Sequence, residues 1–103
     1  MRTYLVAYEL PSSPPASFAL AGLIGPQNLD ALIQKIKSYG PWARPLDSVW
    51  IIRSEKDAMA IARELQALIR QSDRLIVLEI SSGWATVNGK NDVIEWLRKV
   101  VAA

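Results

Sequence analysis

The side chains able to carry chemistry in this sequence are carboxylates, hydroxyls, amines and guanidinium groups, because the chain contains no histidine and no cysteine. Without these two residue types, zinc sites, serine–histidine triads and thiolate catalysis are excluded. Any bound metal must then be a hard ion held by oxygen, such as Mg²⁺ or Mn²⁺. What remains is metal-assisted chemistry at an acidic side chain, or binding through basic and aromatic side chains.

Basic residues that could contact phosphates lie in the middle of the chain. Lys35 and Lys37 are near the end of a predicted helix, and Arg44 and Arg53 are in the two strands predicted after it. Phosphate contacts from such side chains would bind DNA or RNA. The net charge of +2, from 12 basic and 10 acidic residues, does not by itself indicate nucleic-acid binding. The alternative interpretation is an ordinary solvated surface.

Two other groups of residues allow both a functional and a structural interpretation. Asp47 and Ser48, between two predicted strands, could supply a metal ligand and a phosphate contact, or simply make a local turn. Among the four tryptophans, Trp42 and Trp84 lie beside turns and could stack on bases. The other two tryptophans are expected to pack in the interior.

Hydrophobic periodicity predicts the elements that position these residues. Apolar residues at helical spacing follow Asn28, a predicted N-cap, and Ser54, which with Asp57 is expected to begin a capping box. The first of these helices ends at Gly40 and Pro41. Runs rich in β-branched and aromatic residues predict strands over residues 3–10, 42–46, 49–53 and 75–80. The order is therefore strand, helix, strand, strand, helix, strand.

Two successive split β-α-β units are typical of a ferredoxin-like fold. The sequence thus predicts one α+β domain over residues 1–103, with a four-stranded antiparallel sheet and two helices on one of its faces. Residues 11–27 would be a loop insertion, with the apolar stretch Phe18–Ile24 packed on the domain. Residues 82–103 would be a C-terminal appendage formed by a short hairpin or helix, with Asn88-Gly89 as a turn signal and Asn91 as the expected cap of the helix.

The strands offer apolar side chains on both faces of the sheet, whereas two helices can cover only one face. The other face would expose roughly several hundred Å² of apolar surface, which is large for a monomer. The appendage could cover part of it. A second sheet in a two-fold dimer is the economical cover for the rest, so we predict a homodimer.

The sequence also indicates a location. Residues 1–6 lead directly into a strand pattern, without the apolar core and cleavage site of a signal peptide. No apolar run approaches the ~18 residues needed to span a bilayer. We therefore expect a cytoplasmic protein with no membrane partner.

Three short segments carry a resemblance to a known family. Tyr4–Leu10 is similar to the first strand of the small CRISPR-associated adaptation nucleases, Leu46–Trp50 resembles their strand after the first helix, and Asp73–Leu78 resembles their last core strand. Gly40-Pro41-Trp42 and Leu46-Asp47-Ser48-Val49-Trp50 are closer still to the pattern of bacterial relatives often labelled SinR-like. The resemblance covers most of residues 1–81 apart from the insertion.

This resemblance implies a ferredoxin-like fold, a symmetric dimer with facing sheets, and nucleic acid as the partner. In some members it implies metal-dependent cleavage of RNA or DNA, at an aspartate that ends the first strand. Glu9 stands at that position here, so the resemblance implies Glu9 as the catalytic residue and as the ligand of Mg²⁺ or Mn²⁺. The alternative for Glu9 is a solvated carboxylate or a salt bridge.

We therefore expect a homodimeric nucleic-acid-associated protein with possible metal-dependent endonuclease activity. A non-catalytic dimer that serves as a protein-interaction scaffold is the second interpretation, and a toxin-like ribonuclease is the third. A regulatory small-molecule site is also open, since ferredoxin-like domains host many of them.

Overall fold

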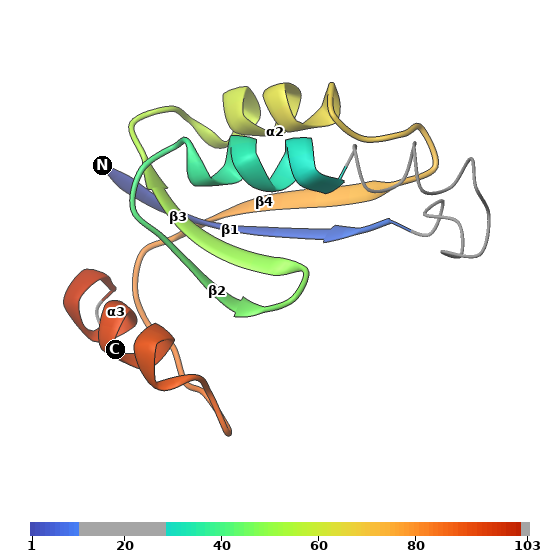
Figure 1. Ribbon diagram of the computed structural model, residues 1–103. Helices are drawn as coiled ribbons and strands as arrows, with labels where there is room; N and C mark the ends of the chain where they lie inside the picture. The colour runs from blue at the N-terminus through green and yellow to red at the C-terminus, as the bar shows by residue number, and fades with distance from the viewer. Residues whose placement is uncertain (11–28, 102–103) are drawn as a thin grey trace.

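The computed structural model describes residues 1–10 and 29–101, and these form a four-stranded antiparallel sheet with helices on both faces (Figure 1). The strand order is β2-β3-β1-β4, so β1 and β3 are central and β2 and β4 form the edges. This confirms the predicted α+β, ferredoxin-like arrangement. The strands are β1 (Arg2–Glu9), β2 (Trp42–Leu46), β3 (Val49–Ser54) and β4 (Arg74–Ile80).

The two predicted helices cover the same face of the sheet (Figure 1). One spans residues 29–37 and the other is α2 (Ala58–Gln66). The cap of α2 is Asp57, whose side chain accepts a hydrogen bond from the Ala60 backbone nitrogen at 2.8 Å. The core between helices and sheet consists of Tyr4, Val6, Tyr8, Leu32, Ile36, Trp50, Ile52, Ile61 and Leu65.

Polar atoms inside this core are paired. Trp50 is fully buried, as predicted, and its indole nitrogen donates to the Tyr8 hydroxyl at 3.1 Å. The Tyr4 ring is also fully buried, and its hydroxyl donates to the Lys56 carbonyl at 2.7 Å. These bonds allow large aromatic rings to fill the core without leaving a polar atom unsatisfied.

The C-terminal appendage is helical and packs on the other face of the sheet of its own chain (Figure 1). Helix α3 (Asn91–Val100) forms a second cluster in which Val93 and Leu97 meet Ala43 and Ile51. Residues 83–87 pair with no strand in the described part of the chain. Trp84 is fixed instead by its indole nitrogen, which donates to the Val101 carbonyl at 3.0 Å.

Helix α3 covers only part of this second face. Residues that lie opposite one another in neighbouring strands point to the same side of the sheet. The strand register therefore identifies further apolar side chains on this face, beyond those in the α3 cluster. Within residues 1–10 and 29–101 these side chains belong to neither buried cluster, and three are exposed: Leu46 by 63%, Ile76 by 51% and Leu78 by 51%. We call this set the open-face patch: Leu5, Ala7, Leu46, Val49, Ile76 and Leu78.

Two predictions concern parts of the chain that the structure does not describe. The loop insertion 11–27, with Phe18–Ile24, and the proposed cap Asn28 lie outside the described residues.

Among the described helices, none has the length and apolar character that crossing a bilayer requires.

Candidate nucleic-acid interface

An exposed tryptophan marks the edge of the sheet at β2. Trp42 is 40% exposed, and its ring packs on the buried Trp50 with centroids 5.2 Å apart and planes tilted by 55°. The preceding Gly40 has a φ of +145°, and a Cβ there would lie 2.8 Å from the Arg53 carbonyl oxygen. Glycine is therefore required for the turn that brings the chain from the helix to β2 and presents Trp42 at the surface.

Three basic side chains from three segments surround this tryptophan pair. The Lys37 ammonium lies 5.0 Å from the centroid of Trp42, and the Arg44 guanidinium carbon lies 4.8 Å from that of Trp50. Lys90, which precedes α3, donates to the Arg44 carbonyl at 3.4 Å. Cation–π attraction to the two aromatic faces favours the positions of Lys37 and Arg44. We call Lys37, Trp42, Arg44 and Lys90 the β2-edge site.

Arg44 is held in place by the turn between β2 and β3. Its Nε and Nη2 atoms donate to the Asp47 carbonyl at 2.9 and 2.7 Å. A guanidinium fixed in this way loses little side-chain entropy when it meets a phosphate. The predicted Asp47–Ser48 pair thus makes the turn, and the Ser48 carbonyl also accepts from the Tyr8 backbone nitrogen at 3.1 Å.

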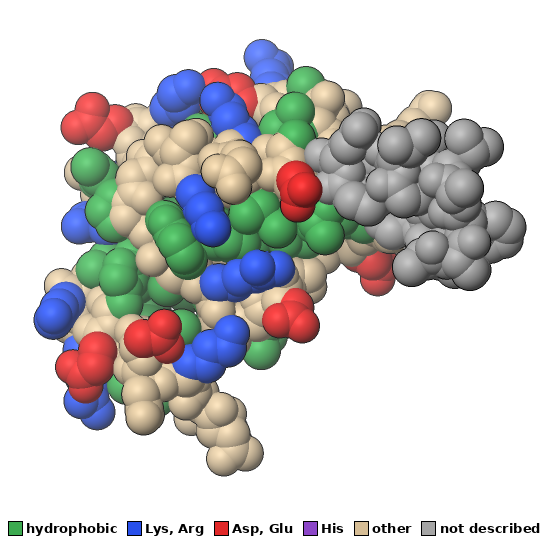
Figure 2. Space-filling view, viewed as in Figure 1, with side chains coloured by type: hydrophobic (Ala, Val, Ile, Leu, Met, Phe, Trp, Pro, Cys, Tyr) green, Lys and Arg blue, Asp and Glu red, His purple; other side chains and the backbone are tan. Residues whose placement is uncertain are grey.

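A shallow hollow of about 400 Å³ opens between β2 and α3 beside this site. Figure 2 shows Lys and Arg side chains on this side of the molecule, interspersed with Asp and Glu and with hydrophobic side chains between them. The hollow is lined by both aromatic and charged side chains, namely Trp42, Ala43, Arg44, Lys90, Asp92, Val93 and Trp96. Its composition suits a ligand that has both a flat apolar part and negative charge.

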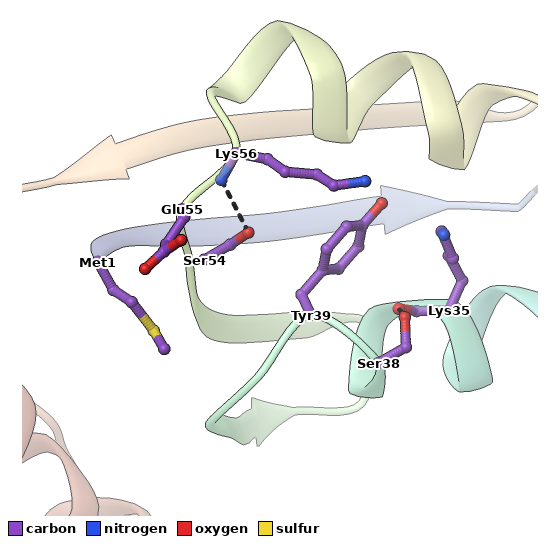
Figure 3. A pocket seen from close by; sticks show the side chains of 7 residues that line it. All are labelled: Met1, Lys35, Ser38, Tyr39, Ser54, Glu55 and Lys56. Atoms are coloured by element: carbon purple, nitrogen blue, oxygen red, sulfur yellow. Dashed lines mark hydrogen bonds between the residues drawn. The ribbon is translucent and has the colours of Figure 1, made fainter.

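Lys35 belongs to a different cluster, although it is only two residues from Lys37. Its ammonium lies 3.4 Å from a Glu64 oxygen and 5.4 Å from the Tyr39 ring centroid. Lys56 pairs with the same carboxylate at 2.6 Å, and Tyr39 donates to it at 2.8 Å. Figure 3 shows Lys35 and Lys56 reaching toward Tyr39 beside a second hollow. The two lysines are thus partly neutralised by one acid.

The electrostatics of this cluster are asymmetric. Hydrogen bonds from Lys56 and Tyr39, with the charge of Lys35 close by, lower the pKa of Glu64 from 4.5 to about 2. Partial burial and the hydrogen bond to that carboxylate raise the pKa of Tyr39 well above its ordinary value of 10.0. Glu64 is therefore an anion at neutral pH and Tyr39 a neutral donor. The cluster ties the end of the first helix to α2.

Arg53 does not join the β2-edge site either. Arg44 and Arg53 lie on neighbouring strands, as predicted, but Arg44 sits over Trp50 on the helix-covered face. Arg53 pairs in register with Thr3, which alternates with Tyr4 of the core and therefore points to the opposite face. Its Nη2 donates to the Met1 carbonyl at 3.1 Å. Of the four predicted basic residues, the structure brings Lys37 and Arg44 together.

Glu9 ends β1 as predicted and lies at the other end of the open face from α3. Its side chain is 65% exposed, and one carboxylate oxygen lies 3.3 Å from Arg74 Nη1. Among the described residues no group of three or more acidic side chains gathers around a possible metal position. One carboxylate already paired with arginine is a poor donor set for Mg²⁺ or Mn²⁺. The residues within one copy therefore do not fit the metal that the resemblance implies.

Sequence reasoning missed Lys90 and Trp96 as neighbours of this site. Their place depends on where the start of α3 packs, and the periodicity of α3 predicts its buried side but not its position on the sheet. The turn residues Asn88-Gly89, of which Asn88 has a φ of +56°, were the one local signal that the chain reverses just before Lys90.

Comparison with known proteins adds information on the fold. No protein-family model matches the chain, and no curated protein sequence matches it. Among solved structures, the chain is similar to a hypothetical protein from Thermus thermophilus known from its crystal structure, with a TM-score of 0.57 and 22% identity. The similarity covers 86% of this chain and 94% of that one. At this identity the likeness concerns the fold alone.

Proposed function

We propose that this chain binds nucleic acid as a homodimer, with the β2-edge site as the contact surface. The observation that carries the proposal is the grouping of Lys37, Arg44 and Lys90 around an exposed tryptophan. Cations supply the attraction to phosphates, and an exposed aromatic ring supplies a surface for bases. This combination explains how a chain with a net charge of only +2 can bind a polyanion: the charge is local.

The open-face patch supports the dimer. Leu46, Ile76 and Leu78 are each more than half exposed and lie on one continuous sheet face. A second copy related by a two-fold axis would cover this patch with the same apolar side chains. Lys37, Trp42 and Arg44 of the β2-edge site lie toward the helix-covered face, so pairing of the open faces leaves these three side chains accessible. A dimer then carries two such sites.

A salt titration of binding tests the nucleic-acid proposal. Each phosphate contact contributes roughly 0.9 to the slope of log K against log salt on duplex DNA, and roughly 0.7 on single strands. Fluorescence anisotropy with labelled oligonucleotides should therefore show binding that weakens steeply with salt. The K37A/R44A variant should lower the slope by roughly 1.4 to 1.8 for each engaged copy.

The matched control is R63A/K99A, which removes the same charge from exposed positions on α2 and α3. This variant should retain the slope of the unmodified protein. Absence of binding at low salt would overturn the proposal and favour a protein-interaction scaffold. Equal losses in the two variants would show that net charge, and not the β2-edge site, governs binding.

Cleavage of the bound strand is the second candidate, and the position of Glu9 on the open face favours it. Because one copy offers a single carboxylate paired with Arg74, a metal-dependent reaction would need a further acidic ligand from the second copy. The test is cleavage of labelled RNA and DNA with Mg²⁺ or Mn²⁺, with EDTA and Glu9→Gln as controls. If the Glu9→Gln variant still cleaves, Glu9 takes no part in the reaction.

A further inference from the structure

The β2-edge site has a feature that phosphate binding alone does not use, namely the exposed ring of Trp42. Contact with Trp50 buries only part of the Trp42 ring, because 40% of the residue stays exposed. We propose that the site selects single-stranded nucleic acid, one base of which stacks on Trp42. This inference rests on the proposed nucleic-acid binding and specifies its substrate class.

The surroundings of Trp42 suit a stacked base. Trp50, at a centroid distance of 5.2 Å, is completely buried and supports the ring from the protein side. The Lys37 ammonium lies 5.0 Å from the ring centroid and is carried by an exposed, flexible side chain. An incoming base takes the place of this ammonium over the ring, and Lys37 then pairs with the neighbouring phosphate. Stacking and phosphate contact are thereby coupled through one lysine.

The adjacent hollow accommodates the rest of a nucleotide. Its volume of about 400 Å³ lies between β2 and α3, with Arg44 and Lys90 on its walls for phosphate oxygens. Asp92 also lines it, and its carboxylate can accept hydrogen bonds from base amino groups but repels phosphate. With the sugar and phosphates of that nucleotide in the hollow, phosphate oxygens toward Arg44 and Lys90 and an amino group at the edge of the base toward Asp92 satisfy all three side chains.

Duplexes do not fit this arrangement. Bases in a duplex are stacked on one another, so reaching Trp42 would require one of them to be unpaired, unstacked and flipped out of the helix. A single strand presents its bases at little cost, and because every base has a π-face the preference for sequence is weak. The site therefore discriminates by strandedness and tolerates many sequences.

Substitutions at Trp42 test this inference. Base–aromatic stacking on one ring changes affinity by roughly 5- to 100-fold when the ring is removed. In anisotropy measurements at fixed low salt, Trp42→Leu should weaken binding of a single-stranded 12-mer by that factor, whereas Trp42→Phe should recover most of the affinity. Both variants keep an apolar side chain on Trp50, and thermal melts establish that they fold. Duplex binding should be the same in all three proteins.

The outcomes separate this inference from the proposed function. If Trp42→Leu and Trp42→Phe bind the single strand as the unmodified protein does, stacking on Trp42 is refuted while phosphate binding stands. If duplex and single strand bind with equal affinity, and the K37A/R44A variant weakens both to the same extent, the site recognises charge alone. The proposed selection of single strands is then refuted. If neither nucleic acid binds at low salt, the proposed function itself fails, and the inference with it.

Discussion

Removal of two side chains from the open-face patch should dissociate the proposed dimer. Full burial of a leucine or isoleucine side chain is worth about 1.5–3 kcal/mol. Ile76 and Leu78 are each 51% exposed in one copy, so covering the remainder contributes about 1 kcal/mol for each side chain. Because each residue occurs twice in a two-fold interface, the two side chains contribute about 4 kcal/mol in total to the free energy of association. The I76S/L78S variant should therefore raise the dimer dissociation constant by roughly 1,000-fold.

Sedimentation equilibrium between 1 and about 100 μM measures this constant directly, because a standard dimer interface keeps protein associated in that range. The control is M59S/V87S, which removes exposed apolar side chains of 61% and 89% exposure from outside the patch. This control should leave the dissociation constant unchanged. A monomeric mass of the unmodified protein at the highest concentration would refute the dimer, and an unchanged constant in I76S/L78S would place the interface elsewhere.

Two further predictions concern stability. Because the pKa of Glu64 is lowered from 4.5 to about 2, its stabilisation is complete above its unfolded-state value and is lost as the pH falls toward 2. Urea unfolding at pH 7, 4 and 3 should show a smaller loss of stability for Glu64→Gln than for the unmodified protein; parallel losses would contradict the pairing with Lys56 and Tyr39. Replacing Leu65, a fully buried residue on the inner side of α2, by alanine should lower the free energy of unfolding by about 2–5 kcal/mol. A decrease in the free energy of unfolding of less than about 1 kcal/mol would show that the core beneath α2 is not packed as described.

The fold could be predicted from local patterns because the elements that define it are strongly patterned. β1 and β3 alternate buried residues toward the helices, and their predicted bounds differ from the observed ones by no more than one residue at each end. The start of α2 was less well predicted. Ser54 was expected to begin a capping box, but Asp57 caps the helix, and the Ser54 hydroxyl accepts from the Lys56 backbone nitrogen at 3.1 Å. Side chains of both types can cap, so their order alone does not decide which one does.

The start of α3 shows the same limit. Asn91 was expected to cap this helix, but the cap position is Lys90, which makes no side-chain capping bond. Lys90 instead extends to the Arg44 carbonyl. The side chain at the cap position thus bonds to another strand and not to its own helix. The sequence of one segment does not predict a contact of this kind, because it depends on where the segment packs.

The candidate site could be predicted only in part, because residue type does not fix which face a side chain occupies. Lys35 and Lys37 are equivalent in the sequence, yet the two-residue step turns them to different sides of the helix. Lys35 meets Glu64 and Lys37 meets Trp42. Arg44 and Arg53 are separated in the same way by the pleat of the sheet and by the irregular register between Ala43 and Leu46.

The most direct test of nucleic-acid binding at the β2 edge is a titration of ¹⁵N-labelled protein with a single-stranded 12-mer, followed by amide and indole NMR resonances. Binding at this site predicts that the Trp42 indole signal and the amides of Lys37, Arg44 and Lys90 shift together. The indole signal of Trp84, which is bonded to the Val101 carbonyl, should remain in place. Shifts centred on Glu9 and Arg74 with Trp42 unchanged, or no shifts at low salt, would contradict binding at this site.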